Sequence, residues 1–250
     1  MSGHSKWAQI KRQKGANDAK RGQMFTKLAR EIMVAARQGG GDPETNFRLR
    51  LAMQRARSLN MPQENIQRAI ARATGAGDGA AQLEEVTYEG YGPGGVAIYV
   101  EALTDNRNRT VAEVRNVFTR HGGNLGENGS VAWLFEPRGI VAVSLDGQDA
   151  EQVELAAIDA GAQDFNQDGS MLEVYTEVEN LEQVRRAMEA AGLEVEAAER
   201  TLVPSTMVTL DDQKSTQVVR LLERLEDLDD VQNVSTNLDL SQELVAQLAS

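Results

Sequence analysis

An internal repeat in the second half of this 250-residue chain constrains its fold more than any other feature. Two segments resemble each other at a constant offset of 31 residues, and each has the pattern of a strand followed by a helix. The offset relates Val143, Glu151-Gln152-Val153, Ala156, Ala160 and Gly161 to Val174, Glu182-Gln183-Val184, Ala187, Ala191 and Gly192. With a short extra strand after each half, the order is βαββαβ, which is the ferredoxin-like plan. We therefore expect residues 138–203 to form a ferredoxin-like domain.

The segments on either side of the repeat predict two parts of one α/β domain. Before it, residues 86–89 and 96–100 predict strands, Thr110 with Glu113 predicts a capping box that starts a helix, and residues 131–135 predict a third strand. After it, an amphipathic helix around residues 218–228 and a strand at 231–234 would complete the sheet. The sequence thus predicts a discontinuous α/β domain of residues 79–137 and 204–240, with residues 138–203 inserted in it and residues 241–250 as a C-terminal tail.

Residues 24–78 have the period of helices and predict a helical domain. Apolar residues from Phe25 to Ala36 recur at helical spacing, Asp42-Pro43 is typical of an N-cap followed by a first-turn proline, and Pro62 is expected to open a third helix. Residues 1–23 keep no such period and indicate a mobile basic arm. The expected fold class is α+β, with an N-terminal three-helix domain and two α/β domains, one of them ferredoxin-like and inserted in the other.

Charge is divided unevenly along the chain. Residues 1–74 contain 15 Lys and Arg against 5 Asp and Glu, a net charge of +10, while the remaining 11 basic and 33 acidic residues give −22. The overall net charge of −12 conceals this division. A split of this size predicts different partners for the two parts, and an anionic partner such as nucleic acid for the first.

Three groups of residues are candidates for nucleic-acid binding. Lysine and arginine supply phosphate contacts, and a tryptophan supplies a ring on which a base can stack. Arginines four or seven residues apart share a helix face, where their mutual repulsion would be relieved by an anion. For the pair in the polar segment 104–110, phosphate contact and ordinary loop chemistry are equally open. The candidates are Lys6, Trp7, Lys11, Arg12, Lys14, Lys20 and Arg21 in the arm, Arg48, Arg50, Arg55, Arg57, Arg68 and Arg72 on the helices, and Arg107 and Arg109 in that segment.

The sequence predicts no catalytic, metal or cofactor site. The chain has no cysteine, and His4 and His121 are too far apart to suggest a metal cluster. Residues 90–95 match G-x-G-x-x-G, but a strand is expected to follow, so a hairpin is favoured over a nucleotide site. Carboxylate pairs such as Asp229-Asp230 are abundant and typical of solvated faces or helix caps. No apolar run approaches the ~20 residues of a membrane span. We expect a cytoplasmic, non-enzymatic protein with no membrane partner and no small-molecule substrate.

Several motifs in fixed order resemble the YebC family over essentially the whole chain. They are Gly3-His4-Ser5-Lys6-Trp7, Lys20-Arg21-Gly22, Phe25-Thr26-Lys27, Ala35-Ala36-Arg37, Asn60-Met61-Pro62, Tyr88-Glu89-Gly90-Tyr91-Gly92-Pro93-Gly94-Gly95 and Thr104-Asp105-Asn106-Arg107-Asn108-Arg109-Thr110. The resemblance implies a helical domain followed by two α/β domains, and no catalytic residues. Bacterial members are labelled DNA-binding transcriptional regulators, whereas others look like translation factors that relieve ribosome stalling at proline-rich stretches.

Two functions therefore remain open. The first is a DNA-binding regulator of gene expression. The alternative is a ribosome-associated translation factor whose basic arm and helices bind ribosomal RNA. Trp7, placed between Lys6 and Lys11, favours RNA because a stacking ring suits unpaired bases.

Overall fold

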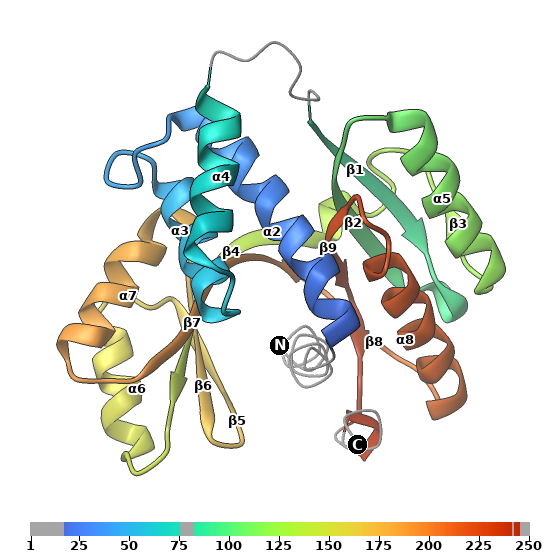
Figure 1. Ribbon diagram of the computed structural model, residues 1–250. Coiled ribbons are helices and arrows are strands. Elements are labelled where there is room, and N and C mark those ends of the chain that lie inside the picture. Colours follow the sequence, from blue (N-terminus) through green and yellow to red (C-terminus); the bar gives the residue numbers. More distant parts are fainter. Residues whose placement is uncertain (1–17, 76–82, 242, 246–250) are drawn as a thin grey trace. The chain divides into compact units, whose positions relative to one another are not determined.

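The computed structural model describes residues 18–75, 83–241 and 243–245, with side chains from residue 21 onward except at 168. It divides into two compact units, one formed by Phe135–Ser205 and a larger one formed by the described residues before and after it. Helices come first and sheets follow, so the predicted α+β fold class is confirmed (Figure 1).

Three helices form a bundle in the first part of the larger unit: α2 (Asp18–Gly39), α3 (Phe47–Ser58) and α4 (Gln63–Thr74). Ile32, Leu49 and Ile66 are fully buried in one shared core. Helix α2 starts before the residue 24 that periodicity suggested, so residues 18–23 are helical. Polar side chains of this helix contact a distant turn that is described below.

The second helix begins at Phe47, and its N-cap is Asn46 rather than the predicted Asp42. The Asn46 side chain accepts from the Leu49 N–H at 3.1 Å and donates to the Ala35 and Gly40 carbonyls, both at 2.8 Å. An amide both donates and accepts, so this buried side chain caps α3 and satisfies carbonyls near the end of α2. The Asp42 carboxylate instead accepts from the Glu44 N–H and so stabilises the turn that precedes α3.

The rest of the larger unit is an antiparallel sheet with two helices. Its strands are β1 (Glu84–Tyr91), β2 (Ala97–Thr104), β3 (Asn124–Leu125) and β9 (Val231–Thr236), in the order β3-β1-β2-β9. The helices α5 (Arg107–Arg120) and α8 (Asp212–Glu226) pack on the side of Ile98 and Val100 (Figure 1). A two-stranded parallel pair, β8 (Val208–Thr209) with β10 (Leu238–Asp239), also belongs to this unit. The late helix and strand thus complete the sheet as predicted.

The glycine-rich segment between β1 and β2 is a hairpin, as predicted. The strands pair antiparallel up to Tyr91 opposite Ala97, and the short helix η1 (Pro93–Gly95) lies between them. Gly94 and Gly95 have φ of 75° and 79°, values that side chains with a Cβ rarely adopt.

Two local predictions in this domain were wrong. Residues 132–134 form the short helix η2 (Ala132–Leu134), and the sheet is extended by β3 instead of a strand at 131–135. The Glu89 carboxylate explains this, because it accepts from the N–H groups of Val131 and Ala132 that a strand would have used. Helix α5 is capped by Asn106, not Thr110, whose hydroxyl is buried and bonded to Asp230 at 2.7 Å.

The smaller unit has the ferredoxin-like plan. Its elements are β4 (Phe135–Ser144), α6 (Ala150–Asp159), β5 (Asp164–Asp168), β6 (Met171–Thr176), a short helix η3 (Val178–Asn180), α7 (Leu181–Ala190) and β7 (Val195–Pro204). The strand order is β5-β6-β4-β7, with every pair antiparallel. The 31-residue offset relates the two helices end to end, and Val153 and Val184 are both buried. Because β4 and β7 pair from Phe135 opposite Pro204, the chain enters and leaves this unit at adjacent positions.

Candidate nucleic-acid interface

The basic candidates of the arm lie mostly outside the described residues. This holds for Lys6, Trp7, Lys11, Arg12 and Lys14, while Lys20 is described by its backbone alone. Arg21 is exposed on the first turns of α2, and its guanidinium carbon lies 5.8 Å from the centre of the Phe25 ring. This is a cation–π contact, and Arg21 forms no ion pair with a carboxylate among the described residues.

The predicted arginine flanks of α3 differ in their surroundings. Arg48 forms an ion pair with Glu85 at 2.6 Å, and Arg55 forms one with Glu31 at 3.8 Å, so acids neutralise this flank. On the other flank, Arg50 is half-buried and donates to the Glu44 carbonyl at 3.3 Å. Arg57 is exposed, and within the described part of the chain it has no ion pair.

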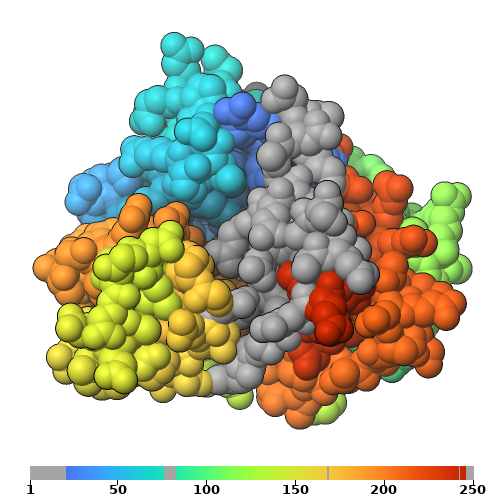
Figure 2. Space-filling model, turned by 90° about the horizontal axis from the view of Figure 1, so that it is seen from below, coloured from blue at the N-terminus to red at the C-terminus, as the bar shows by residue number. Residues whose placement is uncertain are grey.

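Helix α4 presents two further arginines that no described acid neutralises. Arg68 and Arg72 are exposed on one face, opposite the buried Ile66 and Ile70. Arg68 donates to the neutral side chain of Asn65 at 3.3 Å, and neither arginine has an ion pair among the residues with described side chains. Residues 40–75, drawn blue to cyan, form a broad part of the surface in Figure 2. Arg57, Arg68 and Arg72 are therefore available to an anionic ligand.

The polar segment 104–110, which includes the first turn of α5, is mainly structural. Arg107 pairs with Glu84 at 2.9 Å but stays 66% exposed. Arg109 pairs with Asp105 at 2.9 Å and with Asp230 at 2.7 Å. The hydrogen bonds to the Asp230 and Asp105 carboxylates raise the pKa of Arg109 above its ordinary value. Two carboxylates thus already hold the Arg109 guanidinium.

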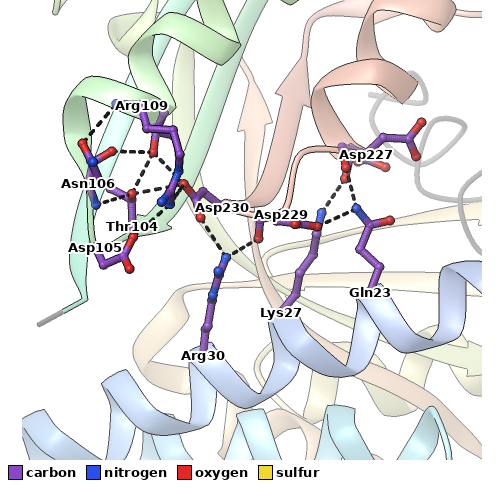
Figure 3. A network of polar contacts seen from close by, with 12 residues as sticks. Gln23, Lys27, Arg30, Thr104, Asp105, Asn106, Arg109, Asp227, Asp229 and Asp230 are labelled. Carbon is purple, nitrogen blue, oxygen red and sulfur yellow. Dashed lines mark hydrogen bonds and ion pairs between the residues drawn. The ribbon is translucent and has the colours of Figure 1, made fainter. Parts of the chain in front are cut away.

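Asp230 is the centre of a polar network that the sequence did not predict (Figure 3). It is 2% exposed, and it accepts from Arg109, from Thr110 and, at 2.9 Å, from Arg30 of α2. Burial alone would raise the pKa of Asp230, but the bonds from Arg109 and Thr110 and the charges of both arginines lower it below its ordinary value. The reading of Asp229-Asp230 as a solvated pair or cap was therefore wrong for Asp230.

Helix α2 contacts the turn between α8 and β9 through one polar stripe. Gln23 donates to the Asp227 carbonyl at 2.5 Å and to the Asp229 carboxylate at 2.8 Å, Lys27 donates to the Glu226 carbonyl, and Arg30 donates to the Asp229 carbonyl (Figure 3). The spacing of Gln23, Lys27 and Arg30 is i, i+4 and i+7, which places them on one helix face. That spacing was the available signal, but the sequence does not identify the distant partner.

A second buried carboxylate organises the loop before the inserted unit. Glu89 is 3% exposed and accepts from the N–H groups of Gly129, Val131 and Ala132 at 2.6, 2.7 and 2.7 Å. Burial raises the pKa of Glu89, and the three backbone donors more than offset this, so the net shift is downward. Glu89 therefore has a structural role as an anion enclosed by backbone amides.

Neither a metal cluster nor a membrane span is found in the described part of the chain. No group of three His, Asp or Glu side chains there is arranged to hold a metal ion. No helix there is both long enough and apolar enough to cross a bilayer.

Comparison with known proteins gives matches along nearly the whole chain. The TACO1/YebC protein N-terminal domain matches residues 5–76, and the TACO1/YebC second and third domain matches residues 83–238. A probable transcriptional regulatory protein of Dehalococcoides mccartyi is 51% identical over 250 residues, covering 100% of this chain and 99% of that protein. One of Moorella thermoacetica is 55% identical over 251 residues, covering 99% of each. The crystal structure of a conserved hypothetical protein from Aquifex aeolicus matches with a TM-score of 0.82 and 46% identity, over 90% of this chain and 93% of that one.

Proposed function

The chain belongs to the TACO1/YebC family, and from this premise we propose that it is a cytoplasmic, non-enzymatic regulator of gene expression that binds duplex DNA. The names of the relatives support regulation of transcription. The observation that carries nucleic-acid binding is a group of exposed arginines on α3 and α4 that form no ion pair with any described residue, Arg57, Arg68 and Arg72, in the segment with a net charge of +10.

The physical argument rests on unneutralised charge. Arg68 and Arg72 are four residues apart on one helix face, where two like charges destabilise the helix slightly. A phosphate backbone relieves this repulsion, and guanidinium groups can bond its oxygens in pairs. The counterions released from DNA then contribute to the affinity, which makes binding depend on salt.

The salt dependence of binding tests the proposal. The triple variant Arg57→Gln, Arg68→Gln and Arg72→Gln is compared with the full-length protein, using fluorescence anisotropy with a mixed-sequence DNA duplex. Each lost phosphate contact reduces the slope of log K against log salt by about 0.9, so three contacts predict a change of about 2.7.

The matched control replaces the arginines that acids already neutralise. Arg48→Gln with Arg55→Gln removes side chains paired with Glu85 and Glu31, so the slope should change little. Equal slopes for the protein and its triple variant, both with unchanged melting temperature, would contradict the proposal.

Ribosomal RNA is the alternative ligand, and Trp7 is the residue that favours it. In the sequence the indole lies between Lys6 and Lys11, a composition suited to stacking on an unpaired base beside phosphates. Trp7→Ala should then weaken binding to structured RNA by about 1–3 kcal/mol and leave duplex DNA affinity unchanged. Deleting residues 2–17 removes the arm ahead of α2 and should weaken binding to either ligand. A ligand preference for RNA over duplex DNA would support the translational function.

A further inference from the structure

We propose that helix α5 lies in the major groove of duplex DNA and reads base edges with its exposed face. The inference rests on the proposed function and adds to it the element that confers sequence preference. It concerns side chains outside the basic N-terminal segment, in a part of the chain that is otherwise acidic.

The first observation is where the positive charge lies. Residues 83–134 contain four basic residues, and all four lie on α5: Arg107, Arg109, Arg115 and Arg120. The first two are paired with acids, as described above. Arg115 and Arg120 are exposed and form no ion pair with any residue whose side chain is described. The helix carries a single acid, Glu113, which is half-buried.

The second observation is the composition of the exposed face. Thr110, Val114 and Phe118 are fully buried against the sheet and fix which side of α5 faces outward. The outward residues form two neighbouring rows at helical spacing. These rows are Asn108, Ala112, Arg115 and Thr119, and Asn116 and Arg120, all of them exposed.

These residue types match the chemistry of the major groove. Arginine donates two hydrogen bonds to guanine, asparagine pairs with the acceptor and donor edge of adenine, and alanine or threonine methyl groups contact the thymine methyl. The major groove of B-DNA, about 12 Å wide, admits an α-helix, whereas the major groove of A-form RNA is too narrow for side chains to read. The face therefore favours DNA over double-stranded RNA.

The neighbouring helix shows that this composition is particular to α5. Helix α8 packs beside α5 on the same core, and it also has exposed arginines, Arg220 and Arg224. There they alternate with acids such as Glu223 and Glu226, and Arg224 lies 3.4 Å from Asp227. Such mixed charge is typical of a solvated face, and it makes α8 the matched control.

Selection from a random DNA pool tests the inference. Full-length protein is used to enrich duplexes of about 20 base pairs, or two helical turns. Affinities for the enriched duplex and for a shuffled duplex are then measured by anisotropy. The variants are Asn116→Ala with Arg120→Gln on α5, Arg115→Gln alone, and the control Arg220→Gln with Arg224→Gln on α8. All positions are exposed, so an unchanged melting temperature is expected for each variant.

We expect each α5 variant to lose affinity for the enriched duplex by about 5- to 150-fold per lost contact, which is the range for one bidentate contact between a side chain and a base. The loss of affinity for the shuffled duplex should be smaller. The α8 variant should bind both as the unmodified protein does. The inference is overturned if no sequence is enriched, if α5 and α8 variants behave alike, or if only an RNA hairpin is bound and α5 substitutions leave that binding unchanged. The proposed function survives the first two results when the Arg57, Arg68 and Arg72 variant still reduces the salt slope.

Discussion

Replacing Asp230 with alanine tests how helix α2 is attached to the sheet of the larger unit. The Asp230 carboxylate is 2% exposed, and it accepts from Arg30, Arg109 and Thr110 at 2.9, 2.7 and 2.7 Å. Removing one partner of a buried ion pair costs about 3–5 kcal/mol, because the opposite charge is left unpaired. Arg30 and Arg109 keep 21% and 42% of their side chains exposed, so water compensates them in part. We therefore expect the lower end of that range, about 3 kcal/mol.

The assay is urea unfolding followed by circular dichroism, with the free energy of unfolding compared at equal m-value. Asp229→Ala is the matched control, since this exposed neighbour accepts a single side-chain bond from Gln23 at 2.8 Å. Its expected effect is within about 0.5 kcal/mol. Hydrogen exchange at the Leu103 amide, which donates to the Asp230 carbonyl at 2.8 Å, reports on the network locally. If Asp230→Ala and Asp229→Ala lowered the free energy of unfolding equally, the argument that the buried carboxylate holds the network would be refuted.

A double-mutant cycle separates charge from packing at the same site. Asp230→Asn keeps an acceptor oxygen of similar shape but removes the charge, and Arg30→Gln removes the guanidinium from α2. Because the two side chains are in contact, we expect a coupling energy of about 1 kcal/mol, within the range found for paired neighbours. If the two substitutions lowered the free energy of unfolding additively, the Arg30–Asp230 ion pair would not help to hold α2, and its other hydrogen bonds to the turn would account for the attachment.

Three further predictions concern the buried carboxylates and the inserted unit. Glu89→Gln should lower the free energy of unfolding by about 2 kcal/mol, since an uncharged amide is a weaker acceptor for three backbone N–H groups; urea unfolding measures this, and a loss no greater than that of the exposed Glu127→Gln would contradict it. The pKa values of Glu89 and Asp230 are both lowered by folding, so their stabilisation is complete above the unfolded values of about 4 and is lost as the pH falls through the lower folded values. Free energies of unfolding between pH 7 and pH 3 check this, and a profile that is flat in acid would be inconsistent with it. Finally, residues 135–205 expressed alone should unfold cooperatively in urea, because they form a compact unit; an unstructured fragment would show that the boundary is misplaced.

The arrangement of elements was predictable where the signal was repetitive. The equivalence of Glu151-Gln152-Val153 and Glu182-Gln183-Val184 indicated the inserted unit because both copies bury the same side of a helix. The strand expected at 131–135 failed because two of its N–H groups bond to Glu89, a residue more than 40 positions earlier. Local pattern alone could not reveal a partner so distant in sequence.

The candidate site was predictable in composition but not in geometry. The sequence identified Arg48, Arg55 and Arg68 as helix-surface arginines, and all three are on helix surfaces. Whether such a residue is neutralised depends on tertiary neighbours: Arg48 contacts Glu85 in the strand after the next helix, and Arg55 contacts Glu31 in the helix before. Arg115 and Arg120 were not proposed as binding residues, because the acidic composition around α5 obscures their concentration on one helix.

The adjacent entry and exit of the inserted unit influence the order in which the chain folds during synthesis. Residues 135–205 are complete before α8 and β9 have been made, and domains generally fold as units from the N-terminus onward. Once β4 pairs with β7, Phe135 and Pro204 are held together, which shortens by more than half the free chain between β2 and β9. Halving a loop lowers the entropic cost of closing it by about 0.6 kcal/mol. Early folding of the inserted unit thus makes it easier for β9 to pair with β2, whose sheet begins more than a hundred residues earlier in the chain.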